Sequence, residues 1–156
     1  MKPHTTETST FSASSCQSQP TSQTSPYLSL DETNALIHAS LDSRLRRLNR
    51  TDMMSTDEAA TLLGTSRVTI NAWIAKGRCI GLTQTKRGFK VPRWQFEPTV
   101  WPHVAEISQA FRSCEGWALL NFFEAPHGGL DGLTPRQALE QGLAERVLAV
   151  ARAEGA

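Results

Sequence analysis

A chain of 156 residues can hold one ordinary domain or two very small ones, but not a large enzyme fold together with a regulatory domain. No apolar run approaches the roughly 18 residues of a membrane span, and no signal peptide is recognisable, so we expect a cytoplasmic protein without membrane contact. The net charge of +1 conceals a division, since residues 1–43 carry −3, residues 44–93 carry +8 and residues 94–156 carry −4. The middle third is therefore expected to meet a polyanion.

The residues able to support catalysis or metal binding are scattered along the chain. Cys16, Cys79 and Cys114 lie far apart, and none belongs to a CxxC pair or has a histidine at metal-ligand spacing. The four histidines have no neighbouring cysteine or paired carboxylates. We therefore expect no metal, no cofactor and no enzymatic activity, and we interpret the cysteines as reduced, buried thiols.

Residues 1–28 are predicted to be a disordered arm, because 13 of the first 26 residues are serine or threonine. Such a segment buries too little apolar surface to offset its ordering entropy. The arm is either a functional linker or a simple tail, for instance one added by an upstream start codon.

Residues 29–50 are predicted to form an amphipathic helix. Its apolar residues recur at helical spacing, and arginines crowd its last turns, where cations oppose the negative end of the helix dipole. The apolar positions are Ile37, Leu41, Leu45 and Leu48, and the arginines are Arg44, Arg46 and Arg47. This stripe could seal a dimer or cover the next domain, and packing within the chain is the favoured interpretation.

Residues 51–96 contain two short helices with clear end signals. Ser55 followed by Glu58 forms a capping box, and Gly64 supplies the left-handed residue that ends the first helix. Ser66 caps the second helix and Gly77 closes it. The inner faces are expected to be Ala59, Leu62 and Leu63 in the first helix, and Val68, Ile70, Trp73 and Ile74 in the second.

A basic β-hairpin is expected directly after the second helix. Residues 79–85 and 89–91 are short strand-like runs, joined by a turn of Lys86, Arg87 and Gly88. The order of two helices and a basic hairpin predicts a winged helix-turn-helix, in which the second helix reads base edges and the wing contacts phosphates. A solvated polar face and a charged turn without a ligand are the alternatives.

The run TDEAATLLGTSRVTINAWIAKGR with this hairpin resembles the excisionase and MerR-type winged helix-turn-helix. Asn71 stands where the excisionase pattern has a tyrosine, so the DNA target is not inherited from the resemblance. The candidate DNA-binding residues are Ser66, Arg67, Thr69, Asn71, Lys76, Arg78, Lys86, Arg87 and Lys90.

Residues 97–156 are predicted to form a small helical bundle. Apolar spacing marks one helix by Val104, Ile107 and Phe111, and a second, central helix by residues 117–123. Thr134, Pro135 and Gln137 then form an N-cap, a first-turn proline and a capping-box partner, and a last helix runs over residues 143–153. The fold class expected for the whole chain is mainly α, with a winged helix-turn-helix followed by this bundle.

The motifs VPRWQFE, WALLNFFEAPHGGLDGLTPRQALEQG and ERVLAVARAEG resemble the toxin-binding domain of the Xre/MbcA/ParS antitoxins, the partners of RES-domain toxins. The resemblance implies a type II antitoxin that binds operator DNA, represses its own operon and blocks an NAD-targeting toxin. It also implies candidate partner-binding residues, namely Pro126, Gly129, Leu130, Thr134, Pro135, Arg136 and Arg152.

A homodimer or larger homo-oligomer is expected, because a single small winged unit reads only a few base pairs. The alternative function is a stand-alone transcriptional regulator or excisionase-like recombination factor whose C-terminal bundle only dimerises.

Overall fold

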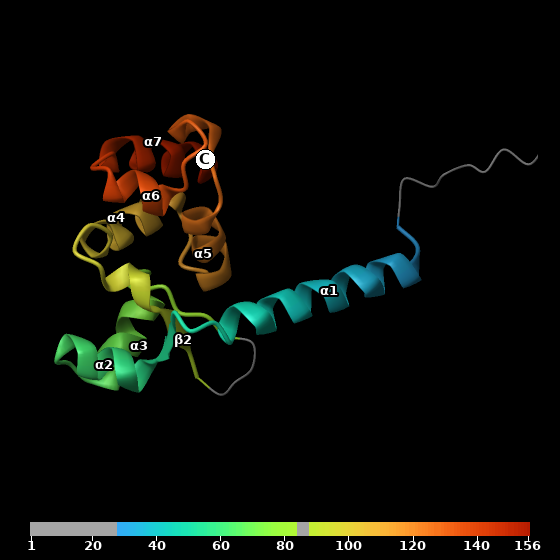
Figure 1. Ribbon diagram of the computed structural model, residues 1–156, viewed down its shortest axis with the longest axis horizontal. Helices are drawn as coiled ribbons and strands as arrows, with labels where there is room; N and C mark the ends of the chain where they lie inside the picture. Colours follow the sequence, from blue (N-terminus) through green and yellow to red (C-terminus); the bar gives the residue numbers. More distant parts are fainter. Residues whose placement is uncertain (1–27, 84–87) are drawn as a thin grey trace, which may run out of the picture.

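The computed structural model describes residues 28–83 and 88–156 as a mainly helical protein with one small sheet (Figure 1). In these two ranges the chain forms α1 (Leu30–Leu48), β1 (Met53–Ser55), α2 (Thr56–Leu63), α3 (Arg67–Ala75), β2 (Lys90–Pro92), α4 (Trp101–Phe111), α5 (Gly116–Glu124), α6 (Pro135–Glu140) and α7 (Ala144–Glu154). Short 3-10 helices occupy Arg93–Phe96 and Gly128–Leu130. The arm predicted over residues 1–28 lies outside the described residues, apart from Leu28, and stays a prediction.

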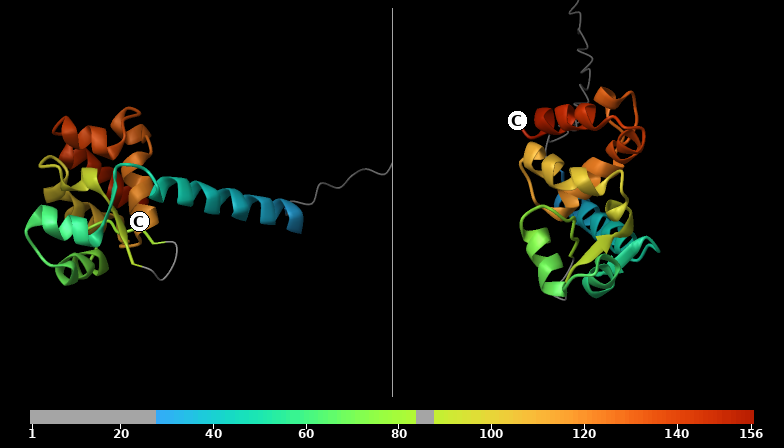
Figure 2. Two further views of the ribbon diagram at one scale, coloured as in Figure 1. Left: turned by 60° about the horizontal axis from the view of Figure 1, so that its bottom comes forward. Right: turned by 90° about the vertical axis from the view of Figure 1, so that its left-hand side faces the viewer.

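The elements are arranged along a body from which α1 projects (Figures 1 and 2). The small sheet, α2 and α3 lie at one end of this body, and α6 and α7 lie at the other. Helices α4 and α5 lie between the two ends. We use "the body" below for residues 51–83 and 88–156.

The predicted helix ends are confirmed where a local signal marks them. Ser55 and Thr134 each form a capping box, with Glu58 and Gln137 respectively, and Ser66 accepts a hydrogen bond from the N–H of Thr69. Gly64 has φ 63°, the left-handed conformation that lets α2 end and the chain turn into α3. These signals act within one turn of the chain, so they do not depend on the remaining fold.

The sheet differs from the expected hairpin. Strand β2 pairs antiparallel with β1, and the register sets Met54 opposite Val91. The first expected strand, residues 79–85, contributes only an antiparallel bridge between Leu82 and Lys90, with N···O distances of 2.7 and 2.8 Å. The segment before α2 therefore takes most of the pairing that we expected within the hairpin, and the turn residues 84–87 lie outside the described residues.

A small core joins α2, α3 and the sheet. Its buried residues are Met54, Ala59, Ala60, Ile70, Ile74, Cys79 and Val91. Two expected core positions are wrong, because Leu62 is 50% exposed and Val68 is 77% exposed. In a helix, residues two apart point in directions about 200° apart, so burying Ile70 turns Val68 outward.

The larger core lies among α4, α5, α6 and α7. The central position expected for residues 117–123 is confirmed, because four side chains of α5 are buried there. The expected inner face of the last helix is also confirmed. These residues are Leu119, Leu120, Phe122 and Phe123 in α5, and Val147, Leu148 and Ala151 in α7.

The two cores are tied together through the segment that follows α3. The fully buried amide of Gln95 accepts a hydrogen bond from the Ile80 N–H at 2.7 Å and donates one to the Ile80 carbonyl at 3.0 Å. Gly116 packs so closely on Gly81 that a β-carbon at position 116 would overlap the Gly81 carbonyl oxygen. These contacts make the body one packed unit.

Helix α1 corrects the expectation that its stripe packs within the chain. None of its residues is buried, and Ile37, Leu41 and Leu45 are 52%, 40% and 46% exposed. Only its last turns touch the body, where Leu48 packs against the larger core and Arg47 pairs with Asp52 and Glu124.

Candidate nucleic-acid interface

The first turn of α3 presents the start of the candidate interface. The Ser66 Oγ accepts a hydrogen bond from the Thr69 N–H at 3.2 Å and lies 2.9 Å from the Thr69 Oγ1. Ser66 is exposed and Thr69 is half-buried. The cap therefore orders the helix N-terminus, where N–H groups and the helix dipole favour an anion such as phosphate.

Arg67 and Asn71 lie one turn apart on α3. The Arg67 side chain is 59% exposed and stands 3.8 Å from Asp57, which is 70% exposed. A pair this long and this exposed adds little stability, so it leaves the guanidinium able to move to a ligand. Asn71 is half-buried beside it. These are side-chain types that bond guanine and adenine edges.

The remaining candidate cations lie further along the chain. Lys76 caps the C-terminal end of α3, and the guanidinium of Arg78 stacks 5.6 Å from the Trp73 ring centre. Lys90 is exposed on β2 and lies near Glu58, whose pKa is below its ordinary value mainly because Ser55 donates to its carboxylate, with a smaller attraction from Lys90. Lys86 and Arg87 lie outside the described residues.

The structure thus brings together Ser66, Arg67, Thr69 and Asn71 on the first two turns of α3. It places Lys76 and Arg78 around the far end of that helix, and Lys90 on the strand. Arg67 and Asn71 form a polar edge on one flank of the exposed α3 face, and Thr69 lies on the opposite flank. Of the basic residues expected in the wing, Lys90 is the one within the described residues.

Sequence reasoning missed the centre of the exposed α3 face. Val68, Ala72 and Ala75 recur at helical spacing and are exposed, with Val68 at 77%. Small apolar side chains on a recognition helix allow close approach and can contact the methyl group of thymine. Val68 escaped notice because an apolar residue on a short helix is normally assigned to the core.

The candidate partner-binding residues divide into exposed and packed positions. Pro126, Gly129 and Arg152 are exposed, whereas Leu130 is buried in the larger core and Pro135 is buried at the start of α6. The Thr134 side chain is occupied by the N-cap of α6. Only part of the set predicted from the resemblance is therefore accessible to another protein.

Arg136 holds the larger core against the segment before α4. Its guanidinium lies 3.3 Å from Glu97 and 3.1 Å from Glu140, and it stacks 5.4 Å from the Trp94 ring centre. These contacts leave the side chain half-buried. Its observed contacts are thus internal ones.

Two residues absent from the prediction fasten the glycine-rich loop to α7. The His127 ring lies 2.8 Å from Glu154 through Nδ1, and its Nε2 lies 3.0 Å from the Phe122 carbonyl oxygen. Arg146 donates to Asp131 and to the Gly129 carbonyl, each at 2.9 Å. The loop is therefore a shaped surface, although its glycines alone would suggest freedom of movement.

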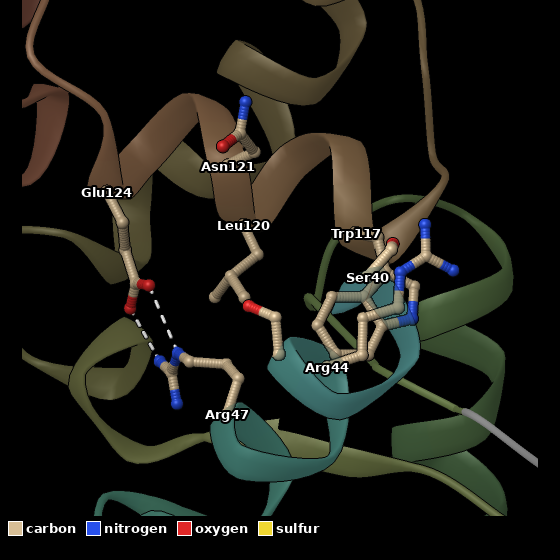
Figure 3. A pocket seen from close by; sticks show the side chains of 8 residues that line it. Ser40, Arg44, Arg47, Trp117, Leu120, Asn121 and Glu124 are labelled. Carbon is tan, nitrogen blue, oxygen red and sulfur yellow. Dashed lines mark hydrogen bonds and ion pairs between the residues drawn. The ribbon is translucent and has the colours of Figure 1, made fainter. Parts of the chain in front are cut away.

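A cavity of about 430 Å³ lies where α1 meets α5 (Figure 3). Arg47 hydrogen-bonds Glu124 across it, and Arg44 lies 5.1 Å from the Trp117 ring centre. Burial alone would lower the pKa of Arg47, but its bonds to Glu124 and Asp52 outweigh that effect and raise it. Residues 77 positions apart make this joint, so sequence spacing offered no signal for it.

The cysteines and possible metal ligands give no second site in the described residues. Cys79 is buried, as expected, and burial raises the pKa of its thiol to about 12. Cys114 is exposed, which corrects the expectation of buried thiols. Residues 28–83 and 88–156 contain no cluster of histidine, cysteine and carboxylate side chains fit for a metal ion. Across the same ranges, every helix is too short or too polar to span a membrane.

Comparisons with protein families, with curated proteins and with solved structures find no match to this chain.

Proposed function

We propose that this chain is the DNA-binding antitoxin of a type II toxin–antitoxin system, acting in the cytoplasm as a homo-oligomer. It represses its own operon through residues 51–96 and neutralises a RES-type, NAD-targeting toxin through residues 97–156. The resemblances of both segments motivate the two halves of this proposal, and the charge division of the chain supports it.

The DNA-binding half is carried by one observation, the capped helix α3 with its exposed polar edge. Arg67 and Asn71 lie along that edge and Ser66 caps the start of the helix, all within the most basic third of the chain. As a winged helix-turn-helix, α3 enters the major groove while Lys90 on β2 approaches the phosphate backbone. Val68 sits between the polar residues and adds an apolar contact to a thymine methyl.

The partner-binding half rests on the loop between α5 and α6. This loop is fastened to α7 by His127 and Arg146, so it presents Pro126 and Gly129 in a defined shape. Arg152 is exposed on α7. Residues 94–156 carry a net charge of −4, opposite to the DNA-facing third, so this part suits a protein partner better than DNA.

A second candidate function is a stand-alone regulator whose C-terminal bundle has no toxin partner. The burial of Leu130 and Pro135 and the internal pairing of Arg136 favour it, because these residues already have packing roles. Both functions include DNA binding, and only the first includes a toxin as a protein partner.

The DNA-binding half is tested by selecting duplexes from a random pool with the full chain. Arg67→Ala and Asn71→Ala should each lose about 1–3 kcal/mol on the selected duplex and relax its base preference. Lys90→Ala should weaken binding to all duplexes alike and flatten its salt dependence. If no sequence is enriched, or if all three variants behave alike, the assignment of α3 and the wing is wrong.

Val68 provides a sharper measurement on the same duplex. Replacing each thymine by uracil removes one methyl group, and the position facing Val68 should weaken wild-type binding but leave the Val68→Ala variant unaffected. Equal losses for both proteins at every position would show that Val68 reads no methyl group.

The partner-binding half is tested by co-expression with the product of the adjacent gene, followed by purification and a growth assay. Arg152→Glu should impair capture and neutralisation while leaving duplex binding unchanged, and Arg67→Ala should do the reverse. Specific duplex binding without capture or neutralisation of that product would favour the stand-alone regulator.

A further inference from the structure

The uncovered apolar stripe of α1 consists of Leu30, Ile37, Leu41 and Leu45. Leu30 is 83% exposed, and Ile37, Leu41 and Leu45 are each at least 40% exposed. Their spacing of four or seven residues places them on one face of the helix, with Asn34 completing the repeat. We call this set the α1 stripe.

The body does not cover the α1 stripe. The side of α1 that faces α5 is formed by Ser40, Ser43, Arg44 and Arg47, which line the cavity in Figure 3. Each residue advances about 100° around a helix, so Leu41 and Leu45 lie on a different side from these four. Figures 1 and 2 show the first turns of α1 standing away from every other described element.

A helix of this composition needs packing to be stable. It is 19 residues long but contains no buried residue, and it includes Thr33, Asn34, His38 and Ser40, all weak helix formers. In proteins, most helical stability comes from packing of an apolar face rather than from intrinsic propensity. We therefore expect the α1 stripe to pack against another apolar surface.

The charges along α1 identify that partner. Residues 28–42 contain Asp31, Glu32 and Asp42 and no lysine or arginine, whereas residues 43–50 contain four arginines and no acidic residue. Arg47 is already paired with Asp52 and Glu124, so the basic half that faces a second copy consists of the other three arginines. Two copies lying antiparallel set the acidic half of each helix beside the basic half of the other, and their helix dipoles also oppose. A parallel pair would set like charges side by side.

We propose that α1 is an antiparallel self-association helix, whose stripe is covered by the α1 stripe of a second copy. In full overlap, Ile37 packs against Leu41 of the second copy and the two bodies lie at opposite ends of the helix pair. The proposal identifies the surface for the proposed homo-oligomer, but it depends on neither DNA binding nor a toxin.

The first test compares two charged substitutions in the full chain by equilibrium sedimentation. Leu41→Glu places a carboxylate in the paired stripe, so the dissociation constant of the dimer should rise at least about 100-fold. Leu36→Glu is the matched control, because Leu36 is 57% exposed on another side of α1, and it should change the constant less than about threefold.

The second test distinguishes the orientation of the helices. Nitroxide labels are attached to Ala39→Cys or Arg46→Cys, with Cys16 and Cys114 replaced by serine and the buried Cys79 retained. In an antiparallel pair the two labels at position 39 lie level, whereas those at position 46 are offset by about 21 Å along the axis. The label–label distance should therefore be longer at position 46.

Three outcomes would overturn the proposal. The first is a wild-type monomer at every concentration, and the second is equal dissociation of the Leu41→Glu and Leu36→Glu variants. The third is equal label distances at both positions, which would indicate a parallel pair. Duplex selection is read separately, so a failure of self-association and a failure of DNA binding remain distinguishable.

Discussion

Helices α1 and α5 both carry apolar residues at helical spacing, yet they end in opposite environments. In α5 four apolar side chains are buried among α4, α6 and α7, whereas in α1 none is buried. The longer helix is thus the less packed one, with 19 residues against nine. An apolar stripe indicates that one face of a helix favours burial. Whether that face is buried within the same chain depends on the elements around the helix.

The largest expected effect on stability distinguishes the buried apolar residues of α5 from the exposed apolar residues of α1. Leu119→Ala in α5 should lower the free energy of unfolding by about 2–5 kcal/mol, because it opens a cavity in the larger core. Leu41→Ala in α1 should change the stability of the body by less than about 0.5 kcal/mol. Urea titration followed by tryptophan fluorescence, at dilutions that keep the chain monomeric, measures both. Similar losses would mean that α1 packs on the body in solution.

The start of α5 offers a second contrast, between two glycines. Gly116→Ala should destabilise the body by about 1–3 kcal/mol, since the added β-carbon meets the Gly81 carbonyl oxygen. Gly128→Ala is the control, because no atom lies within 4 Å of a β-carbon built there and its φ is not left-handed. Thermal melts of the two variants give the comparison, and a stable Gly116→Ala protein would contradict the close approach of the two backbones.

The pH dependence of stability tests whether solvent is excluded from Cys79 in the smaller core. The pKa of the Cys79 thiol is about 12 in the folded protein, above its value in the unfolded chain. The unfolded chain therefore loses this proton at lower pH than the folded protein does. The contribution of the neutral thiol to the free energy of unfolding is complete below the unfolded pKa and is lost as the pH rises towards 12. Between pH 8 and pH 10 this loss should reach about 1–2 kcal/mol in the native chain and vanish in Cys79→Ala. Urea titrations at each pH measure the difference, and parallel curves for the two proteins would show that Cys79 is solvated.

Helix caps give the smallest and most selective contrast. Thr134→Ala removes the capping box of α6 and should lower the stability of the body by about 1 kcal/mol. Ser29→Ala removes the same motif from α1 and should reduce only its helicity, because α1 contributes no buried residue. Circular dichroism would report the lost helix, and denaturant titration would report the unchanged body. A global loss in Ser29→Ala would show that α1 is coupled to the body beyond Arg47.

Local chemistry accounts for the features that could be predicted. Ser55, Ser66 and Thr134 bond the N–H three residues ahead, so each start signal lies within a single turn. The same holds for Gly64, whose left-handed conformation any longer side chain would strain. The polar edge of α3 was predictable for this reason, since its residues follow directly from where the helix begins.

Contacts between distant residues account for the features that were missed. The β1–β2 pairing joins Met54 to Val91, and the joint of α1 joins Arg47 to Glu124, with no spacing rule linking either pair. Val68 was misassigned because apolar character alone does not say which side of a short helix faces inward. The family resemblance predicted a partner surface that includes Leu130 and Arg136, but the contacts of these two residues are internal.

The sequence by itself determined where α2, α3 and α6 begin, which third of the chain is basic and which helices carry an apolar face, because these depend on neighbouring residues. Only the tertiary structure decided that α5 is enclosed while α1 is left open, that Val68 faces outward, and that the buried Gln95 bonds the backbone of Ile80. These outcomes depend on contacts between residues that are distant in the sequence, because burying one face of a helix against another element leaves its opposite face exposed.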